Sequence, residues 1–221
     1  MEYDFTLTES WNGSIVLNEL NSGYSLVFYK VIHNEGEKIK VGLNHPIERA
    51  LQLTSRDLSF YVRTFPELRE VNPKFQYVEV GAGLGGWITS LIDKIGKNSP
   101  KPIVIDMADY RLIQAMLRYS KTLDLGLRQE RLDILCDRVD TYLSDDRIRL
   151  INLSLGEALE SEKSLNGCAD VVVDCCGAVS YPLTEPVGDQ LTDRNKLRRS
   201  VLELENKLLK PTGSFFHKLI G

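Results

Sequence analysis

The sequence lacks several features that would have indicated a membrane, secreted or generally cationic protein. No apolar run in its 221 residues approaches the roughly 20 residues needed to cross a bilayer. The N-terminal stretch MEYDFTLTES is polar and acidic, without the apolar segment of a signal peptide, so we expect a cytoplasmic protein. The formal net charge is −4, so no overall positive field attracts the chain to phosphate backbones.

Cysteine and histidine are also scarce. The chain has four cysteines and three histidines, and no pair of cysteines has the C-x-x-C spacing of a zinc or redox site. We therefore expect reduced thiols and no metal centre. With 43% hydrophobic and 26% charged residues, and no repeat or low-complexity tract, the composition is that of an ordinary globular domain.

The N-terminal part differs in pattern from the rest and suggests a division into residues 1–45, a β-rich extension, and residues 46–221, the main domain. GSIVLNEL and YSLVFYKVI are joined by a short turn, which predicts an antiparallel hairpin over residues 14–32. HNEGEKIKVGL is a candidate third strand. Residues 45–65 are expected to be helical, with Thr54 and Asp57 at capping-box spacing.

Beyond residue 75, short apolar runs alternate with amphipathic segments. This alternation predicts an α/β fold, a Rossmann-like, doubly wound and mostly parallel sheet. The expected strands are QYVEV, PIVIDM, IRLINL, ADVVVDC and GSFFHKL, and the expected helices are residues 84–95, 109–125, 128–143, 155–161 and 193–209. In such sheets the ligand binds at the carboxyl ends of the strands.

The first of these strands leads into a glycine-rich turn, VEVGAGLGGW. Gly81, Gly83 and Gly86 satisfy the pattern G-x-G-x-x-G, in which backbone N–H groups at a helix N-terminus approach an anionic group. Pyrophosphate fits this turn, and so does the carboxylate of a methionine moiety. The glycines alone do not separate the two cofactors, nor exclude a tight turn without a ligand.

Glu79 favours the cofactor with the methionine moiety over a dinucleotide. It lies at the end of a buried strand, where dinucleotide-binding turns usually keep an apolar residue, and a buried carboxylate needs a partner. The ammonium group of S-adenosylmethionine is a suitable partner. The segment E-V-G-A-G-L-G resembles the first motif of the class I S-adenosylmethionine-dependent methyltransferases. Asp106 ends the second strand, where a carboxylate accepts the ribose hydroxyls of either adenosyl cofactor.

The resemblance extends over residues 75–221 and implies further site residues. It places an adenine contact after the third strand, at Asn152 or Ser154, and the motif beside the transferred methyl group at Asp174. The cofactor-binding residues that it implies are Glu79, Gly81, Ala82, Gly83, Gly85, Trp87, Asp106, Met107, Asn152, Leu153 and Asp174. The methyl acceptor is left open among RNA, a small molecule and a protein.

Two other functions remain as alternatives. One is a nicotinamide-dependent oxidoreductase, since DVVVDCCGA and LLKPTGSF have looser counterparts in such enzymes. No tyrosine is followed four residues later by a lysine, however, so the short-chain catalytic pair is missing. The other alternative is an adenosyl-binding module without catalysis.

Within the methyltransferases, GLGGW, DVVVD and GSFFHK resemble the FtsJ-type RNA 2′-O-methyltransferases. That family uses a Lys-Asp-Lys-Glu tetrad, and Asp174 and Lys218 match its second and third members, which makes them the expected catalytic residues. Ser59 stands about where the first lysine belongs, and the final glutamate does not appear. Two basic clusters, Arg111, Arg118 and Lys121, and Arg194, Lys196, Arg198 and Arg199, are either RNA contacts or solvated helix faces.

The resemblance also raises a question about the sheet edge. A class I methyltransferase sheet usually has two more strands after the fifth, and the sequence shows no candidates for them. Either the chain is shortened or the N-terminal hairpin covers that edge, since an open parallel edge favours aggregation. The long segment 176–193, which contains Tyr181, is expected to form a lid or substrate rim.

Overall fold

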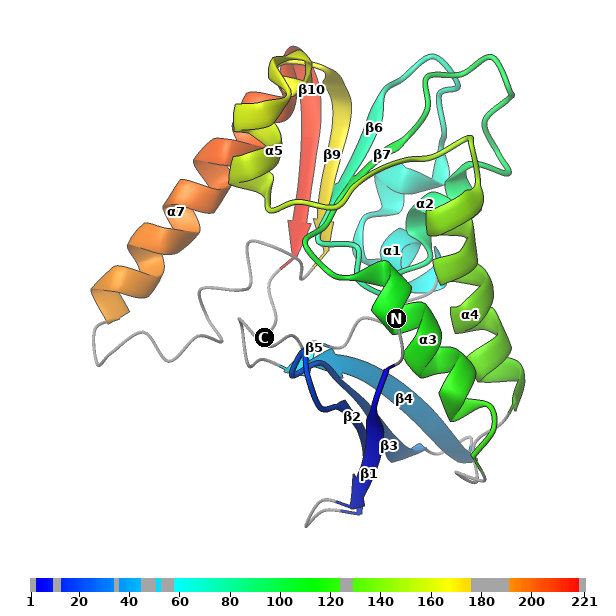
Figure 1. Ribbon diagram of the computed structural model, residues 1–221. Helices are drawn as coiled ribbons and strands as arrows, with labels where there is room; N and C mark the ends of the chain where they lie inside the picture. The colour runs from blue at the N-terminus through cyan, green and yellow to red at the C-terminus, as the bar shows by residue number, and fades with distance from the viewer. Residues whose placement is uncertain are drawn as a thin grey trace.

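The structure, a computed structural model, describes residues 3–9, 13–33, 36–44, 51–52, 58–123, 129–175 and 191–218 (Figure 1). Within these residues no helix is both long and apolar enough to cross a membrane.

The centre of the main domain is a five-stranded sheet in which every neighbouring pair is parallel. Its spatial order is β10-β9-β6-β7-β8. The strand of this sheet that comes first in the chain, β6, therefore lies in the middle, and the strand order reverses there. The strands are β6 (Tyr77–Val80), β7 (Ile103–Ile105), β8 (Arg149–Ile151), β9 (Ala169–Cys175) and β10 (Leu209–Lys218). The predicted Rossmann-like α/β sheet is thus confirmed.

Helices cover both faces of this sheet (Figure 1). The face with α5 (Leu155–Ser161), η2 (Lys163–Leu165) and α7 (Leu191–Leu208) has one apolar cluster, built on Val78, Val80 and Val172. The opposite face, with α1 (Leu58–Thr64), η1 (Pro66–Arg69), α2 (Trp87–Leu91), α3 (Tyr110–Ser120) and α4 (Gln129–Ser144), has the larger cluster. Because alternate residues of a strand face opposite sides, these β-branched runs supply both clusters.

Helix starts follow the local sequence. The Asp109 carboxylate accepts hydrogen bonds from the backbone N–H groups of Arg111 and Leu112, which caps α3. Ser154 and Glu157 form a capping box at α5, whose bounds match the prediction. The helix expected over residues 84–95 is shorter, because the glycine turn extends to Gly86 and α2 starts at Trp87.

The N-terminal strands form a second, antiparallel sheet in the order β1-β2-β3-β4-β5. The predicted hairpin is confirmed as the pairing of β2 and β3, and the candidate third strand is β4. A strand that the sequence did not suggest, β1, pairs with β2. The bounds are β1 (Phe5–Glu9), β2 (Ile15–Glu19), β3 (Ser25–His33), β4 (Gly36–Asn44) and β5 (Leu51–Gln52).

Within the described part of residues 45–65, the expected helix is confirmed for α1 and wrong for residues 51–52. Leu51 and Gln52 are instead a short strand paired with the end of β4, where their backbone groups extend the antiparallel ladder. Thr54 and Asp57, the expected capping box, lie outside the described residues.

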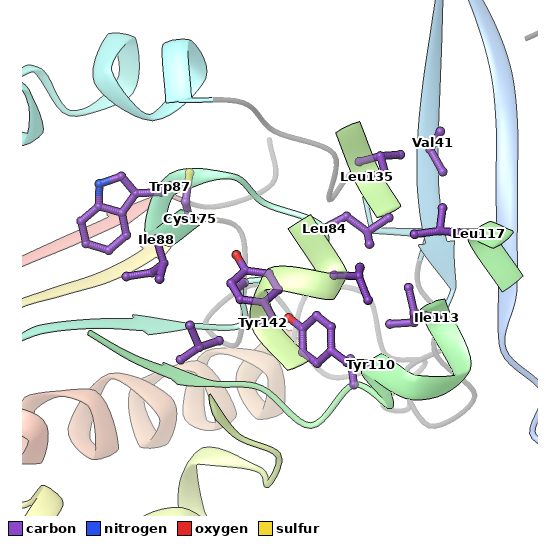
Figure 2. Close-up of a cluster of buried hydrophobic side chains, with 14 of the residues drawn as sticks. Val41, Leu84, Trp87, Ile88, Tyr110, Ile113, Leu117, Leu135, Tyr142 and Cys175 are labelled. Atoms are coloured by element: carbon purple, nitrogen blue, oxygen red, sulfur yellow. The ribbon is translucent and has the colours of Figure 1, made fainter. Parts of the chain in front are cut away.

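The second sheet packs against α3 and does not extend the parallel sheet. Tyr119 on α3 contacts Phe5, with ring centroids 4.9 Å apart, and the Asp109 N–H donates to the Tyr24 hydroxyl over 3.0 Å. Figure 2 shows Val41 of the N-terminal sheet beside Leu117 and Leu135, in the same buried cluster. The expectation that the hairpin covers the edge beyond β10 is therefore wrong: its apolar side chains are buried against α3.

Candidate functional site

The glycine-rich turn lies at the carboxyl end of β6, the central strand. Gly81 and Gly83 have φ angles of 65° and 53°, in the left-handed region that favours glycine. The Gly81 N–H donates to the Ile105 carbonyl over 2.9 Å, and the Gly85 N–H donates to the Ala82 carbonyl over 2.8 Å. The first bond ties the turn to the neighbouring strand β7, and the second closes it onto the start of α2.

The next two glycines are required for close packing. A Cβ atom on Gly85 would collide with the Tyr61 hydroxyl and lie 2.8 Å from the Ala82 carbonyl oxygen. A Cβ atom on Gly86 would lie 2.6 Å from the Arg138 guanidinium carbon. Two of the sequence's glycines are thus explained by side chains from α1 and α4 that contact the turn.

Three polar side chains donate hydrogen bonds to the carbonyl groups of the turn. The Tyr110 hydroxyl donates to Gly83 over 2.9 Å, and the Tyr142 hydroxyl donates to Gly85 over 2.8 Å. Arg138 donates to the Leu84 carbonyl over 3.1 Å. Burial, with the nearby carboxylates, raises the pKa of Tyr110 and of Tyr142 well above the usual value, so both remain neutral donors. These bonds hold the turn in one conformation.

Asp106, predicted to bind ribose, lies directly after β7 and against the turn. One carboxylate oxygen accepts from the Gly83 N–H over 2.7 Å and from the Tyr110 hydroxyl over 3.1 Å. The other accepts from the Ala108 N–H over 2.8 Å. Asp106 is 4% exposed. In this structure its carboxylate stabilises the turn, and Asp106 itself lies at the edge of the site.

Glu79, predicted to meet the cofactor's ammonium group, is buried on the face of the sheet covered by α1. The Tyr61 hydroxyl donates to its carboxylate over 2.6 Å. The Tyr61 ring stacks on Trp87, with centroids 6.2 Å apart. Trp87, expected at the cofactor, is the first residue of α2 and is buried beside Ile88 (Figure 2).

The residues expected around the adenine and ribose follow β7 and β8. The Asn152 amide donates to the carbonyls of Asp106 and Ala108, over 2.9 and 2.6 Å, which joins the ends of these two strands. Leu153 is 36% exposed and Met107 is half-buried. The structure thus places Asp106, Met107, Asn152 and Leu153 at the same edge of the sheet as the glycine turn.

Asp174, the expected catalytic residue, is fully buried near the end of β9, on the face covered by α7. It lies against Glu205, a fully buried glutamate of α7. Burial and the adjacent carboxylate raise the pKa of Glu205 to about 11. Neither carboxyl oxygen of Glu205 has a hydrogen-bond partner among the described residues. The raised pKa implies that Glu205 keeps its proton at neutral pH beside Asp174.

Lys218, the second expected catalytic residue, ends β10 on the other face of the sheet. Its ammonium group lies 5.1 Å from the centroid of the Phe60 ring on α1. In the β9–β10 register, Asp174 is opposite His217, and Lys218 is opposite Cys175. Since neighbouring strands align their side chains by register, the structure does not bring the Asp174 and Lys218 side chains together.

Several other predicted positions have structural explanations. On α3, Arg118 pairs with Asp140 at 3.1 Å and Lys121 pairs with Asp133 at 2.5 Å, so this basic cluster is partly neutralised by α4. Ser59, near the expected first lysine, is exposed on α1. Tyr181 and the rest of residues 176–190 lie outside the described residues, as does the side chain of Arg194.

Sequence reasoning missed the side chains that surround the expected site residues: Tyr61, Tyr110, Arg138, Tyr142 and Glu205. Only Glu205 had a local signal, because it interrupts the apolar stripe of α7 between Leu204 and Leu208. The tyrosines come from three different helices, and no spacing in the sequence links them to the turn.

No protein-family model, curated protein or solved structure matches this chain. Among the described residues, no group of three or more histidine, cysteine, aspartate or glutamate side chains is arranged to hold a metal ion.

Proposed function

We propose that this protein binds S-adenosylmethionine at the glycine turn and is a methyltransferase. The observation that carries the proposal is the pair of buried carboxylates at the ends of neighbouring strands: Glu79 of β6 and Asp106 after β7. Both lie next to a turn with two left-handed glycines at the point where the strand order reverses. An adenosyl cofactor with a positively charged amino acid moiety matches two carboxylates at this position.

Methyl transfer from this cofactor requires few chemical steps from the protein. The bound cofactor supplies an activated methyl group, and the chain has to hold the acceptor in line with it and remove the acceptor's proton where necessary. We assign the proton-accepting role to Asp174. Lys218 does not act together with Asp174, because its ammonium group contacts Phe60 on the face of the sheet opposite to Asp174.

An RNA 2′-hydroxyl is the acceptor class to test first, because GLGGW and GSFFHK both resemble RNA methyltransferase motifs. The salt dependence of binding to a short capped oligonucleotide tests this class. Phosphate contacts release counterions, so affinity for RNA should fall steeply as salt rises. A flat response removes RNA from the candidates and leaves a small molecule or a protein.

Calorimetric titration with S-adenosylhomocysteine and with NAD tests the cofactor. We expect S-adenosylhomocysteine to bind and NAD not to bind. Binding of NAD in place of S-adenosylhomocysteine would mean an oxidoreductase, and binding without methyl transfer to any acceptor class would mean an adenosyl-binding module. Asp106→Asn should weaken S-adenosylhomocysteine binding by about 1–3 kcal/mol, while the exposed control Asp137→Asn should not.

A further inference from the structure

A separate cavity of about 160 Å³ lies on the same face of the sheet as α2, away from the carboxyl ends of the strands. Its walls come from η1, from α2 and from strands β6, β9 and β10. Cavities of this size hold a molecule about as large as benzene. It is open to solvent beside Phe75, which is 38% exposed and precedes β6.

The walls of this cavity are aromatic to an unusual degree for so small a space. Phe75, Tyr77, Trp87 and Phe216 all line it. The ring centroids of Phe75 and Tyr77 are 6.3 Å apart at an interplanar angle of 47°, and those of Tyr77 and Trp87 are 6.0 Å apart at 80°. Successive rings are therefore strongly tilted, so they present differently oriented surfaces around the space instead of stacking flat against each other.

The charge at the cavity is of one sign. Glu67 and Glu70 line it and are exposed, while none of the described lining residues is a lysine or an arginine. Neither glutamate has an ion pair with another described residue of the chain. The Tyr77 hydroxyl is bonded to the backbone of Asn72, accepting over 2.8 Å and donating over 3.2 Å. The cavity thus combines aromatic surface with two available carboxylates.

We propose that this cavity binds a small apolar cation, a quaternary ammonium or alkylated ammonium group. The negative faces of aromatic rings attract a cation with an apolar surface, and the glutamates add a longer-range attraction. A neutral group of equal size gains only the apolar contact, and an anion is repelled. The cavity lies away from the strand ends that carry the proposed cofactor site, although Trp87, which was expected at the cofactor, lines it.

Titration with choline and with its neutral carbon analogue 3,3-dimethylbutan-1-ol tests the proposal. Trp11 and Trp87 are the two tryptophans, so the variant Trp11→Phe makes the emission report on Trp87 alone. We expect a saturable change with choline and an affinity roughly 2- to 30-fold higher than for the neutral analogue. Equal affinities, or no change with choline, would overturn the proposal.

Variants in the same background locate the site. Glu67→Gln with Glu70→Gln should weaken choline binding and leave binding of the neutral analogue unchanged, because it removes charge and keeps the shape. Glu160→Gln, an exposed glutamate on α5, is the control and should change neither. If the double variant binds choline as tightly as its parent, the cation is bound elsewhere and the proposal fails. S-adenosylhomocysteine binding is measured separately, so failure here leaves the proposed function untouched.

Discussion

Replacing Glu205 by glutamine removes the ionisation of a buried carboxyl group whose pKa is strongly raised, with little change in shape. Glu205 is fully buried in α7 against Asp174, and its pKa is about 11 instead of the ordinary 4.5. A glutamine cannot ionise, yet its amide group keeps a hydrogen-bond donor beside Asp174.

The expected magnitude follows from linkage between proton binding and folding. Between pH 4.5 and 11 the folded chain keeps the Glu205 proton and the unfolded chain loses it. The folded state therefore binds more protons, and the free energy of unfolding falls by about 1.4 kcal/mol per pH unit because of this group. At pH 7.5, about three units above the unfolded pKa, the cost of Glu205 is about 4 kcal/mol at most.

Denaturant unfolding of the wild type and Glu205→Gln, at several pH values from about 5.5 to 8.5, measures this effect. We expect the free energy of unfolding of the variant to rise relative to that of the wild type as pH rises, by about 2–4 kcal/mol over this range. Glu203→Gln, an exposed glutamate of the same helix, should show no such gain. Asp174→Asn should reduce the pH dependence without abolishing it, because burial is the first cause of the raised pKa and Asp174 the second.

Parallel pH profiles for the wild type and Glu205→Gln would refute the reasoning. They would mean that Glu205 ionises in the folded protein as it does in the unfolded chain, so that its pKa is not raised by burial beside Asp174. A variant that loses stability relative to the wild type as pH rises would refute it more strongly, since the sign of the linkage would be reversed.

Three further substitutions test the hydrogen bonds and the close packing around the glycine turn. Tyr61→Phe removes the donor to the buried Glu79 and should lower the free energy of unfolding by about 1–3 kcal/mol, measured by denaturant unfolding. Gly85→Ala should lower the free energy of unfolding by at least about 1 kcal/mol. The loss should be smaller in a Tyr61→Phe background, because the clash with the hydroxyl disappears there. Equal losses in both backgrounds would contradict this packing. Tyr110→Phe leaves Asp106 bonded to the turn but removes the donor to the Gly83 carbonyl, and should cost about 1–3 kcal/mol in the same assay.

Much of the fold follows from local patterns in the sequence. The strand β9 and the helix α5 have the predicted bounds, because each depends on neighbouring residues and on backbone preferences. The hairpin of β2 and β3 was predicted for the same reason. Residues 51–52 were not, since their strand exists only through pairing with β4, a contact that no local propensity encodes.

For the candidate site too, some features follow from the sequence and others only from the tertiary structure. The sequence by itself determined the glycine turn and the acids at the ends of β6, β7 and β9, because strand ends and left-handed glycines have local signals. Only the tertiary structure decided what those acids contact: Glu79 meets a tyrosine from α1, and Asp174 meets Glu205 from α7. Asp174 and Lys218 lie on opposite faces of the sheet, although the resemblance to a catalytic tetrad had placed them in one site. The physical reason is that helix packing brings distant residues into contact, and the ionisation of a buried carboxyl group depends on those contacts.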